Sequence, residues 1–201
     1  MVETLVCLAS SHVNSLELSE GFTALSPQNI ARIFDPSEIW LGPRDLLENN
    51  EDFRQLVSYL VLRHEGSVFV YRRTAKGGES RLHGRASVGV GGHWNVGDVV
   101  SDNGVIDAMA TLRRACMREL AEEIECLPPE QVNMVGVIKE SDSAVSRVHL
   151  GVVVECWMST SLVTIVDRGL CDAKFVAKNE LTLLAQEMET WSSRLIPYLC
   201  N

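Results

Sequence analysis

The segment RELAEE, residues 118 to 123, places one arginine and three glutamates within six consecutive positions. If the segment is helical, with 100° between successive residues, Glu119, Glu122 and Glu123 fall within an arc of about 100°. The opposite side of such a helix carries four apolar residues, Met117, Leu120, Ala121 and Ile124. We therefore expect one face of the helix to pack and the other to gather carboxylates.

Three carboxylates at this spacing repel one another, and each pair costs a few tenths of a kcal/mol unless something compensates. A divalent cation would compensate, because Mg²⁺ takes oxygen ligands and is usually held by a few carboxylates together with substrate phosphates. Arg118 lies one turn before Glu122, where it could fix a carboxylate or neutralise part of the cluster. On these residues alone, a merely solvated acidic helix face remains the alternative.

The composition indicates an ordinary globular chain. Its 201 residues, 46% apolar and 22% charged, suffice for one domain with an extension. The formal charge of −9 argues against a general nucleic-acid binder and predicts that any phosphate bound here needs a mediating cation. Six cysteines without a CxxC pair or a zinc-ligand spacing indicate reduced thiols and a cytoplasmic protein. The N-terminus lacks targeting features and no apolar run is long enough for a membrane span.

The elements that must position the acidic segment begin near residue 53. We interpret residues 1–52, which are polar and punctuated by turn signals, as an N-terminal extension that packs on a domain of residues 53–201. LVSYLVLRH (56–64) and SVFVYRR (67–73) are strand-like and are joined by a turn, so they predict a hairpin. RASVGVGGHWNVGD (85–98) contains four glycines and predicts a strand that ends where the backbone approaches something closely.

A helix from about residue 106 to 125, ended by Pro128 and Pro129, would carry RELAEE. Two further strands are expected in 133–140 and 147–158, and a short one in 173–177. A last helix from about residue 179 should pack one face through apolar residues spaced three or four apart: Leu181, Leu184, Met188, Trp191, Leu195 and Leu199. Strands, helix, strands and helix in this order predict an α+β or three-layer α/β/α sandwich with a mixed sheet.

The chain resembles the Nudix hydrolases, whose signature is written GX5EX7REUXEEXGU, with U a bulky aliphatic residue. RELAEEI matches the REUXEEX core, and GGHWNVGD (91–98) resembles the upstream glycine segment, with Gly92 at the first glycine and Asp98 at the first glutamate. The GVGGH segment followed by a stretched signature is similar to a Nudix subset described only as predicted phosphoesterases.

Three features depart from the signature. Asp98 replaces a glutamate, nineteen residues instead of seven separate it from Arg118, and Glu125 stands where a glycine is usual. A register that starts at Gly104 keeps the usual spacing but places Ala110 at the glutamate. In the preferred register, the twelve extra residues form a loop or lengthen the start of the helix. Without a glycine at 125 the helix end must be shaped differently, and Pro128 and Pro129 are the candidates.

The resemblance implies a mixed sheet between helices and hydrolysis of pyrophosphate linkages in nucleoside-diphosphate-type small molecules with Mg²⁺ or Mn²⁺. It also implies roles for individual residues. Glu119, Glu122 and Glu123 become metal ligands, with the carbonyl near Gly92 as a further ligand, and Arg118 orients a carboxylate. The candidates for the general base are Glu119, Glu140 and Asp142.

Cationic side chains near the glycine segment could meet a diphosphate. Arg73, Arg85 and His93 are the substrate-binding candidates, and Arg72, Arg81 and His83 lie close to them in sequence. Ordinary surface charge is the alternative for all of these. His149 lies within an apolar strand, where a core residue bonded to a neighbour is expected more often than a ligand.

Two other functions remain open. The departures from the signature also suit a Nudix-fold module that binds a nucleotide without turnover. An isomerase acting on an isoprenoid diphosphate would need an activated cysteine, and Cys116 and Cys126 show no activating partner. The substrate, the number of metals and the oligomeric state, including a homodimer, are not fixed by these residues.

Overall fold

The structure, a computed structural model, describes residues 2–75 and 82–201. It contains two compact units. The first comprises Met1–Tyr59, Gly92–Arg118 and Val135–Val153, and the second Leu60–Gly91, Glu119–Met134 and Val154–Asn201. Strands β4 (Phe53–His64), β11 (Gln131–Lys139) and β12 (His149–Trp157) and helix α4 (Ala108–Glu123) contribute residues to both units.

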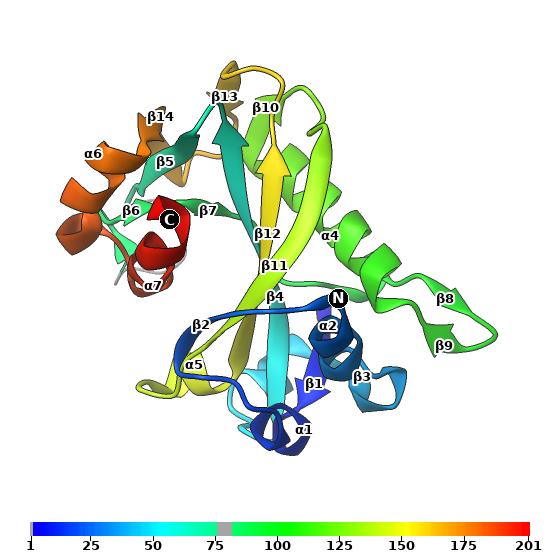
Figure 1. Cartoon of the computed structure of the whole chain (residues 1–201). Helices are drawn as coiled ribbons and strands as arrows, with labels where there is room; N and C mark the ends of the chain where they lie inside the picture. The colour runs from blue at the N-terminus through cyan, green and yellow to red at the C-terminus, as the bar shows by residue number, and fades with distance from the viewer. Residues whose placement is uncertain (1, 76–81) are drawn as a thin grey trace. The chain divides into compact units, whose positions relative to one another are not determined.

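In the first unit, strands from the N-terminal 52 residues extend the sheet (Figure 1). β1 (Thr4–Ala9) is almost wholly buried and pairs antiparallel with β4 through Cys7↔Gln55 and with β3 (Ile39–Pro43) on its other side. β2 (Gly21–Ala24) pairs antiparallel with β11 through Gly136↔Ala24. Short helical elements complete this unit: α1 (Ser10–Ser15), α2 (Pro27–Ile33), η1 (Pro36–Glu38), α3 (Arg44–Leu47), η3 (Val96–Asp98) and α5 (Ala144–Arg147).

In the second unit, β4 and β5 (Ser67–Arg73) form the predicted hairpin, with Arg63↔Val68 and His64↔Ser67 as partners. The turn residues Glu65 and Gly66 both have positive φ, +44° and +80°, as a tight right-twisted hairpin requires. β14 (Leu170–Ala177) pairs antiparallel with the other edge of β5. The remaining elements are β6 (Ala86–Ser87), β7 (Gly89–Val90), β10 (Ile124–Cys126), β13 (Val163–Ile165), α6 (Lys178–Leu183), η4 (Ala185–Glu187) and α7 (Thr190–Cys200).

The sheet is mixed. The amide of Gln55 donates to the carbonyl of Val148 at 2.8 Å in the first unit, and the amide of Met158 donates to the carbonyl of Arg63 at 2.8 Å in the second. Residue numbers rise together along β4 and β12, so these two strands are parallel, whereas β1, β2, β5 and β14 pair antiparallel. The predicted fold class, a mixed sheet combined with helices, is therefore confirmed. Among the described residues, no helix combines the length and the apolarity needed to cross a membrane.

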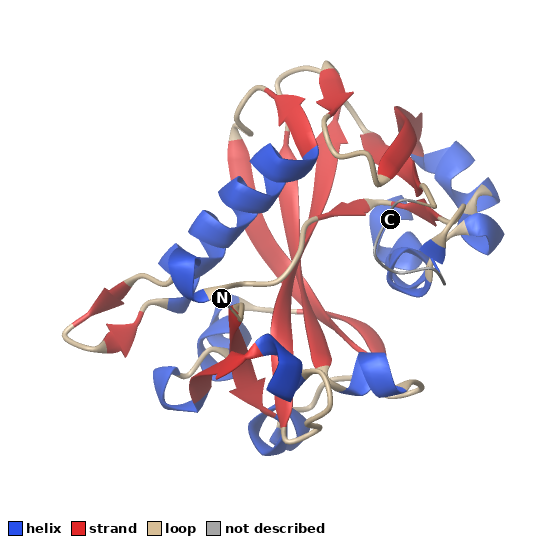
Figure 2. Ribbon diagram, turned by 180° about the vertical axis from the view of Figure 1, so that it is seen from behind, coloured by secondary structure: helices blue, strands red, loops and turns tan. Residues whose placement is uncertain are grey.

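The twelve extra residues of the signature form a hairpin, not the loop or longer helix that we expected. β8 (Ser101–Asp102) and β9 (Val105–Ile106) pair around Asn103 and Gly104, which have φ of +49° and +79°. Figure 2 shows this hairpin leading directly into α4. The helix then starts at Ala108, because the Asp107 carboxylate accepts hydrogen bonds from the amides of residues 109 and 110.

The end of α4 is set by strand pairing. We expected Pro128 and Pro129 to shape it, but the helix stops at Glu123 and the chain continues at once as β10, which pairs with β13. The Glu123 carbonyl accepts hydrogen bonds from the amides of Val166 and Asp167, at 2.9 and 3.1 Å. These two donors satisfy a carbonyl that a glycine-capped helix end would satisfy locally.

Our prediction of a single C-terminal helix is wrong. The segment is broken into α6, η4 and α7, and Met188 between the last two is extended, with φ −79° and ψ 153°. Glu189 starts α7 by accepting hydrogen bonds from the amides of Trp191 and Ser192. The apolar pattern still marked packed positions, because Leu181, Met188, Leu195 and Leu199 are all buried.

Candidate active site

The three glutamates of RELAEE occupy the end of α4, in the second unit. Glu119 is buried, with only 8% of its surface exposed, Glu123 is half-buried, and Glu122 is exposed. Removing a carboxylate from water is costly unless hydrogen bonds or cations compensate. A solvated acidic face therefore does not describe Glu119 and Glu123.

The packing face of α4 differs from the one we predicted. Met117 is 39% exposed and Ala121 is also exposed, although both were expected to pack. The buried stripe instead follows positions 112, 115, 116, 119, 120 and 124, so it includes a glutamate among apolar residues. The buried stripe includes two small residues one turn before the motif, Ala115 and Cys116, and Sγ of Cys116 lies 3.8 Å from the hydroxyl of Ser58 on β4.

Glu123 lies in an unusual electrostatic setting. Burial raises the pKa of its carboxyl to about 7, and the neighbouring charges of Glu119 and Asp167 act in the same direction. The positive charge of Arg73 and a hydrogen bond from the Gly91 amide oppose this rise in pKa. Among the described residues, Oε2 of Glu123 is buried without a hydrogen-bond partner. A carboxylate oxygen in this condition has room in its coordination for a cation.

The glycine segment approaches this carboxylate, as its composition predicted. Gly91 has φ of +138°, a conformation that side chains disfavour, and its amide faces Glu123. Gly92, the predicted carbonyl ligand, lies in the first unit, where its carbonyl accepts a hydrogen bond from the Ser58 amide at 2.8 Å. A carbonyl oxygen has a second lone pair, so a metal role for Gly92 stays a prediction.

Sequence reasoning missed Tyr71 and Asp167. Tyr71 is fully buried on β5 and its hydroxyl donates to the Gly89 carbonyl at 2.6 Å. Nη2 of Arg73 donates to the same hydroxyl at 3.2 Å. Asp167 follows β13 and is held beside the end of α4 by its amide. The alternation of a strand could have paired residues 71 and 73, but the position of Asp167 depends on a contact distant in sequence.

In the first unit, Arg118 and Asp98 form a bidentate ion pair. Nε and Nη2 of Arg118 donate to the two oxygens of Asp98 at 2.9 and 2.8 Å, and Nη2 also donates to the His93 carbonyl at 2.8 Å. Asp98 is buried and accepts from the Asn95 amide as part of a capping box in η3. Arg118 thus fixes the carboxylate at the first acidic position of the signature and closes the β8–β9 insertion.

His93 and His149 are hydrogen-bonded to each other through their Nε2 atoms, 3.0 Å apart. Nδ1 of His149 lies 2.7 Å from the Val145 carbonyl, which can only accept, so this nitrogen carries the proton. His149 therefore accepts from His93 Nε2–H when both rings are neutral. Burial, followed by the charges of His149, Arg44 and Arg118, lowers the pKa of His93 to about 3. The proposed substrate contact of His93 stays a prediction.

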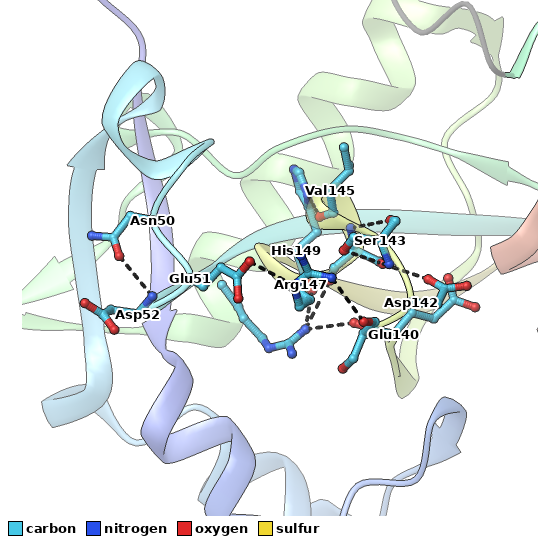
Figure 3. A network of polar contacts seen from close by, with 12 residues as sticks. Asn50, Glu51, Asp52, Glu140, Asp142, Ser143, Val145, Arg147 and His149 are labelled. Atoms are coloured by element: carbon cyan, nitrogen blue, oxygen red, sulfur yellow. Dashed lines mark hydrogen bonds and ion pairs between the residues drawn. The ribbon is translucent and has the colours of Figure 1, made fainter.

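The base candidates Glu140 and Asp142 lie in the loop that precedes α5, also in the first unit. Glu140 is buried, and its carbonyl accepts from Nη1 of Arg54 at 3.2 Å. The same nitrogen lies 3.1 Å from the carbonyls of Ser146 and His149, so one buried guanidinium fastens both ends of the loop. Figure 3 shows Asp142 within the adjoining polar network, where it accepts from the Ser146 hydroxyl at 2.8 Å.

The predicted cationic cluster is only partly assembled. The charge of Arg73 acts on Glu123 within the second unit, whereas the exposed Arg85 donates to the Gln186 carbonyl at 3.3 Å. Arg72 pairs with Glu187. Arg81 lies outside the described residues.

The resemblance implies a divalent metal, and the donor atoms at the end of α4 determine whether one fits. Within residues 2–75 and 82–201, no three His, Cys, Asp or Glu side chains are already gathered as a metal site. The donors at the end of α4 are nevertheless all carboxylate oxygens, and in the part of the chain that the structure describes Oε2 of Glu123 is buried without a hydrogen-bond partner. Such oxygen donors suit hard cations, so the residues present fit Mg²⁺ or Mn²⁺.

The chain is similar in sequence to a known protein and in fold to several solved structures. No known protein-family profile matches it. Protein YmaB of Bacillus subtilis (strain 168) is 30% identical to it over 157 residues, which are 76% of this chain and 74% of YmaB.

Solved structures share its fold. The crystal structure of Tm1382, a candidate Nudix hydrolase, aligns over 99% of both chains with a TM-score of 0.80 and 21% identity. A Nudix hydrolase from Alicyclobacillus acidocaldarius aligns over 73% of this chain and 91% of its own, with a TM-score of 0.53 and 14% identity. DR0079 from Deinococcus radiodurans aligns over 74% and 84%, with a TM-score of 0.51 and 16% identity. The chain therefore belongs to the same family as protein YmaB, and its fold is that of the Nudix hydrolases.

Proposed function

We propose that the protein hydrolyses a pyrophosphate linkage in a small molecule of the nucleoside-diphosphate type, with Mg²⁺ or Mn²⁺. The observation that carries this proposal is the burial of Glu119 and Glu123 on the REUXEEX core, with Oε2 of Glu123 lacking a partner among the described residues. Burying the Glu123 carboxylate with one oxygen that lacks a hydrogen bond costs free energy, and a bound cation would offset this cost. The burial of Glu123 is thus better explained by function than by folding.

Glu119, Glu122 and Glu123 would hold the ion, and the Gly92 carbonyl is proposed as a further ligand. A bound ion would neutralise charge on the diphosphate and lower the pKa of an attacking water. Glu123 must lose its proton to act as a ligand, and since its pKa lies near 7, neutral pH already ionises a substantial fraction of it. The buried Glu119 and Glu140 are the better candidates for the general base, since Asp142 is exposed and bonded within its loop.

The partner is expected to be a small molecule and not a nucleic acid. All six cysteines are free thiols, which supports a reducing, cytoplasmic location. A homodimer stays a prediction.

The test is a screen of the purified protein with Mg²⁺ or Mn²⁺ against nucleoside triphosphates, dinucleoside polyphosphates, nucleotide sugars and dinucleotide cofactors. Glu122→Gln is the critical variant, because this glutamate is exposed and its replacement should leave the fold intact. Loss of partners outside the ligand shell alone costs about 10- to 100-fold, so loss of a ligand should lower turnover by about 100-fold or more. Glu125→Gln, another exposed glutamate two residues past the motif, is the matched control and should retain activity.

A nucleotide-binding module without turnover is the second candidate. It is favoured by one observation: Asp98, at the first acidic position of the signature, has both oxygens bonded to Arg118. This function predicts ligand-dependent stabilisation without product formation. Turnover that disappears in Glu122→Gln would exclude it, whereas stabilisation by a nucleotide with no product would exclude the hydrolase.

A further inference from the structure

Tyr71 joins the glycine segment to Arg73. Its hydroxyl donates to the Gly89 carbonyl and accepts from Nη2 of Arg73. The guanidinium carbon of Arg73 also lies 5.7 Å from the centre of the Tyr71 ring, within the range of a cation–π contact. One fully buried aromatic side chain therefore contacts the guanidinium through both its hydroxyl and its ring.

The backbone of Arg73 is equally constrained. Arg73 pairs with Leu170 of β14, and its amide donates to the Arg85 carbonyl at 3.1 Å. Because residues 71 and 73 are two apart on β5, their side chains share one face of the strand. Arg73 is half-buried as a residue, and Nε of its guanidinium is buried, so the guanidinium is partly desolvated.

The position of Arg73 is unfavourable for a cation site taken alone. Its positive charge acts on Glu123, a proposed metal ligand, and so it would repel a divalent ion bound there. The conflict disappears when an anion shares the site, because a diphosphate can meet both the ion and the guanidinium. A planar guanidinium is also the side chain best suited to bidentate contact with phosphate oxygens.

We propose that Tyr71 is a positioning residue that holds the Arg73 guanidinium against the phosphate oxygens of a diphosphate bound at the end of α4. The inference rests on the proposed function for the nature of the ligand. It adds that Arg73 is the side chain that recognises the diphosphate and that Tyr71 orients Arg73. Among the neighbouring arginines, Arg72 is paired with Glu187 and Arg85 is exposed and bonded to Gln186. Arg73 is instead held by Tyr71 through two contacts, and its charge acts on Glu123 at the end of α4.

The test measures two dissociation constants for wild type, Tyr71→Phe, Arg73→Met and the double variant. One is for methylenediphosphonate, a diphosphate that cannot be hydrolysed, in the presence of Mg²⁺. The other is for Mn²⁺ alone. Arg73→Met should weaken the binding of methylenediphosphonate by about tenfold. The same substitution should tighten the binding of Mn²⁺, because it removes a positive charge that repels the ion. A purely structural role would weaken both ligands together.

Tyr71→Phe removes one hydrogen bond and should raise the dissociation constant of methylenediphosphonate by about fivefold. In the Arg73→Met background the same substitution should change nothing further, since Tyr71 acts through Arg73. Tyr198→Phe is the matched control, because it also removes a tyrosine hydroxyl in the second unit, one bonded to Glu155. It should leave both constants at wild-type values.

The outcomes separate this inference from the proposed function. Additive effects of the two substitutions, parallel weakening of both ligands, or no binding of methylenediphosphonate by the wild type would overturn the role of Tyr71 and Arg73. Wild-type turnover that survives Arg73→Met unchanged would overturn it while leaving the hydrolase intact. Coupled loss of methylenediphosphonate binding in a protein that hydrolyses nothing would support it and refute hydrolysis.

Discussion

The surroundings of the Glu123 carboxyl disfavour its ionised form in the metal-free protein, and a bound cation would favour that form. Burial and two neighbouring acids disfavour its ionised form, and only the Arg73 charge and the Gly91 amide favour it. Sites that bind metals commonly sacrifice stability of the empty protein in this way. The cost should be visible as a pH dependence of stability.

We predict that the stability of the metal-free wild type falls, relative to Glu123→Gln, as pH rises from about 4.5 to about 7. The pKa of this carboxyl is raised from 4.5 to about 7 on folding, so within this window the folded state holds a proton that the unfolded chain has released. The contribution of Glu123 protonation to the free energy of unfolding is thus fully present below pH 4.5 and lost as pH rises through about 7. Melting temperatures of both proteins in a chelator, with Glu125→Gln as the exposed control, measure it. Parallel curves for wild type and Glu123→Gln would contradict the assignment.

At the residue scale, the sequence identified the acidic motif but not its supports. RELAEE and the glycine segment could be recognised because their types and spacing are local. Tyr71 could not be singled out, because a tyrosine in a strand usually packs and only the neighbouring Gly89 carbonyl gives its hydroxyl a role. We expected His93 to contact the substrate, and the structure places its Nε2 in a hydrogen bond with His149, which lies 56 residues away in the sequence.

At the element scale, the strands and α4 could be predicted because hydrophobic periodicity is local. The errors lie where partners distant in sequence set the outcome. The helix α4 ends at β10 because β13 pairs there, and the C-terminal helix breaks where the Glu189 amide donates to the Ala86 carbonyl at 3.0 Å. The insertion is an exception, because its hairpin forms around local turn residues, Asn103 and Gly104, that tolerate positive φ.

The pairing of β2 with β11 offers a test at this scale, and we predict that Gly136→Ala destabilises the protein by about 1–3 kcal/mol. A Cβ at residue 136 would lie 2.4 Å from the Thr23 carbonyl oxygen and 2.4 Å from Cε2 of Phe22. Backbone cannot move aside as a flexible side chain can, so the strands must separate. Denaturant unfolding measures the loss. Gly66→Ala is the control, because its added Cβ meets nothing and only the strain of a positive φ remains. A smaller loss for Gly136→Ala than for this control would argue against the register.

At the scale of the whole molecule, residues 1–52 were interpreted as an extension of a domain that begins at residue 53. In the first unit these residues supply strands of the sheet: β1 is paired with β4, β3 with β1, and β2 with β11. The sequence did not reveal this, because β2 and β3 are short and lie among turn signals. β2 forms a strand because it pairs with β11, which lies more than 100 residues away in the sequence. The alignment with Tm1382 likewise covers 99% of the chain, including this segment.

We therefore predict that a chain starting at Phe53 loses cooperative folding. Without residues 1–52, the edges of β4 and β11 would expose unpaired amides and carbonyls, and the buried residues that β1 covers would meet water. Circular dichroism melts and size-exclusion chromatography should show a broadened transition and aggregation. Adding a separate peptide of residues 1–52 should restore a sharp transition, because the same strand pairs can form between two chains. A truncated chain that melts at the wild-type temperature would instead show that residues 53–201 fold as a domain of their own.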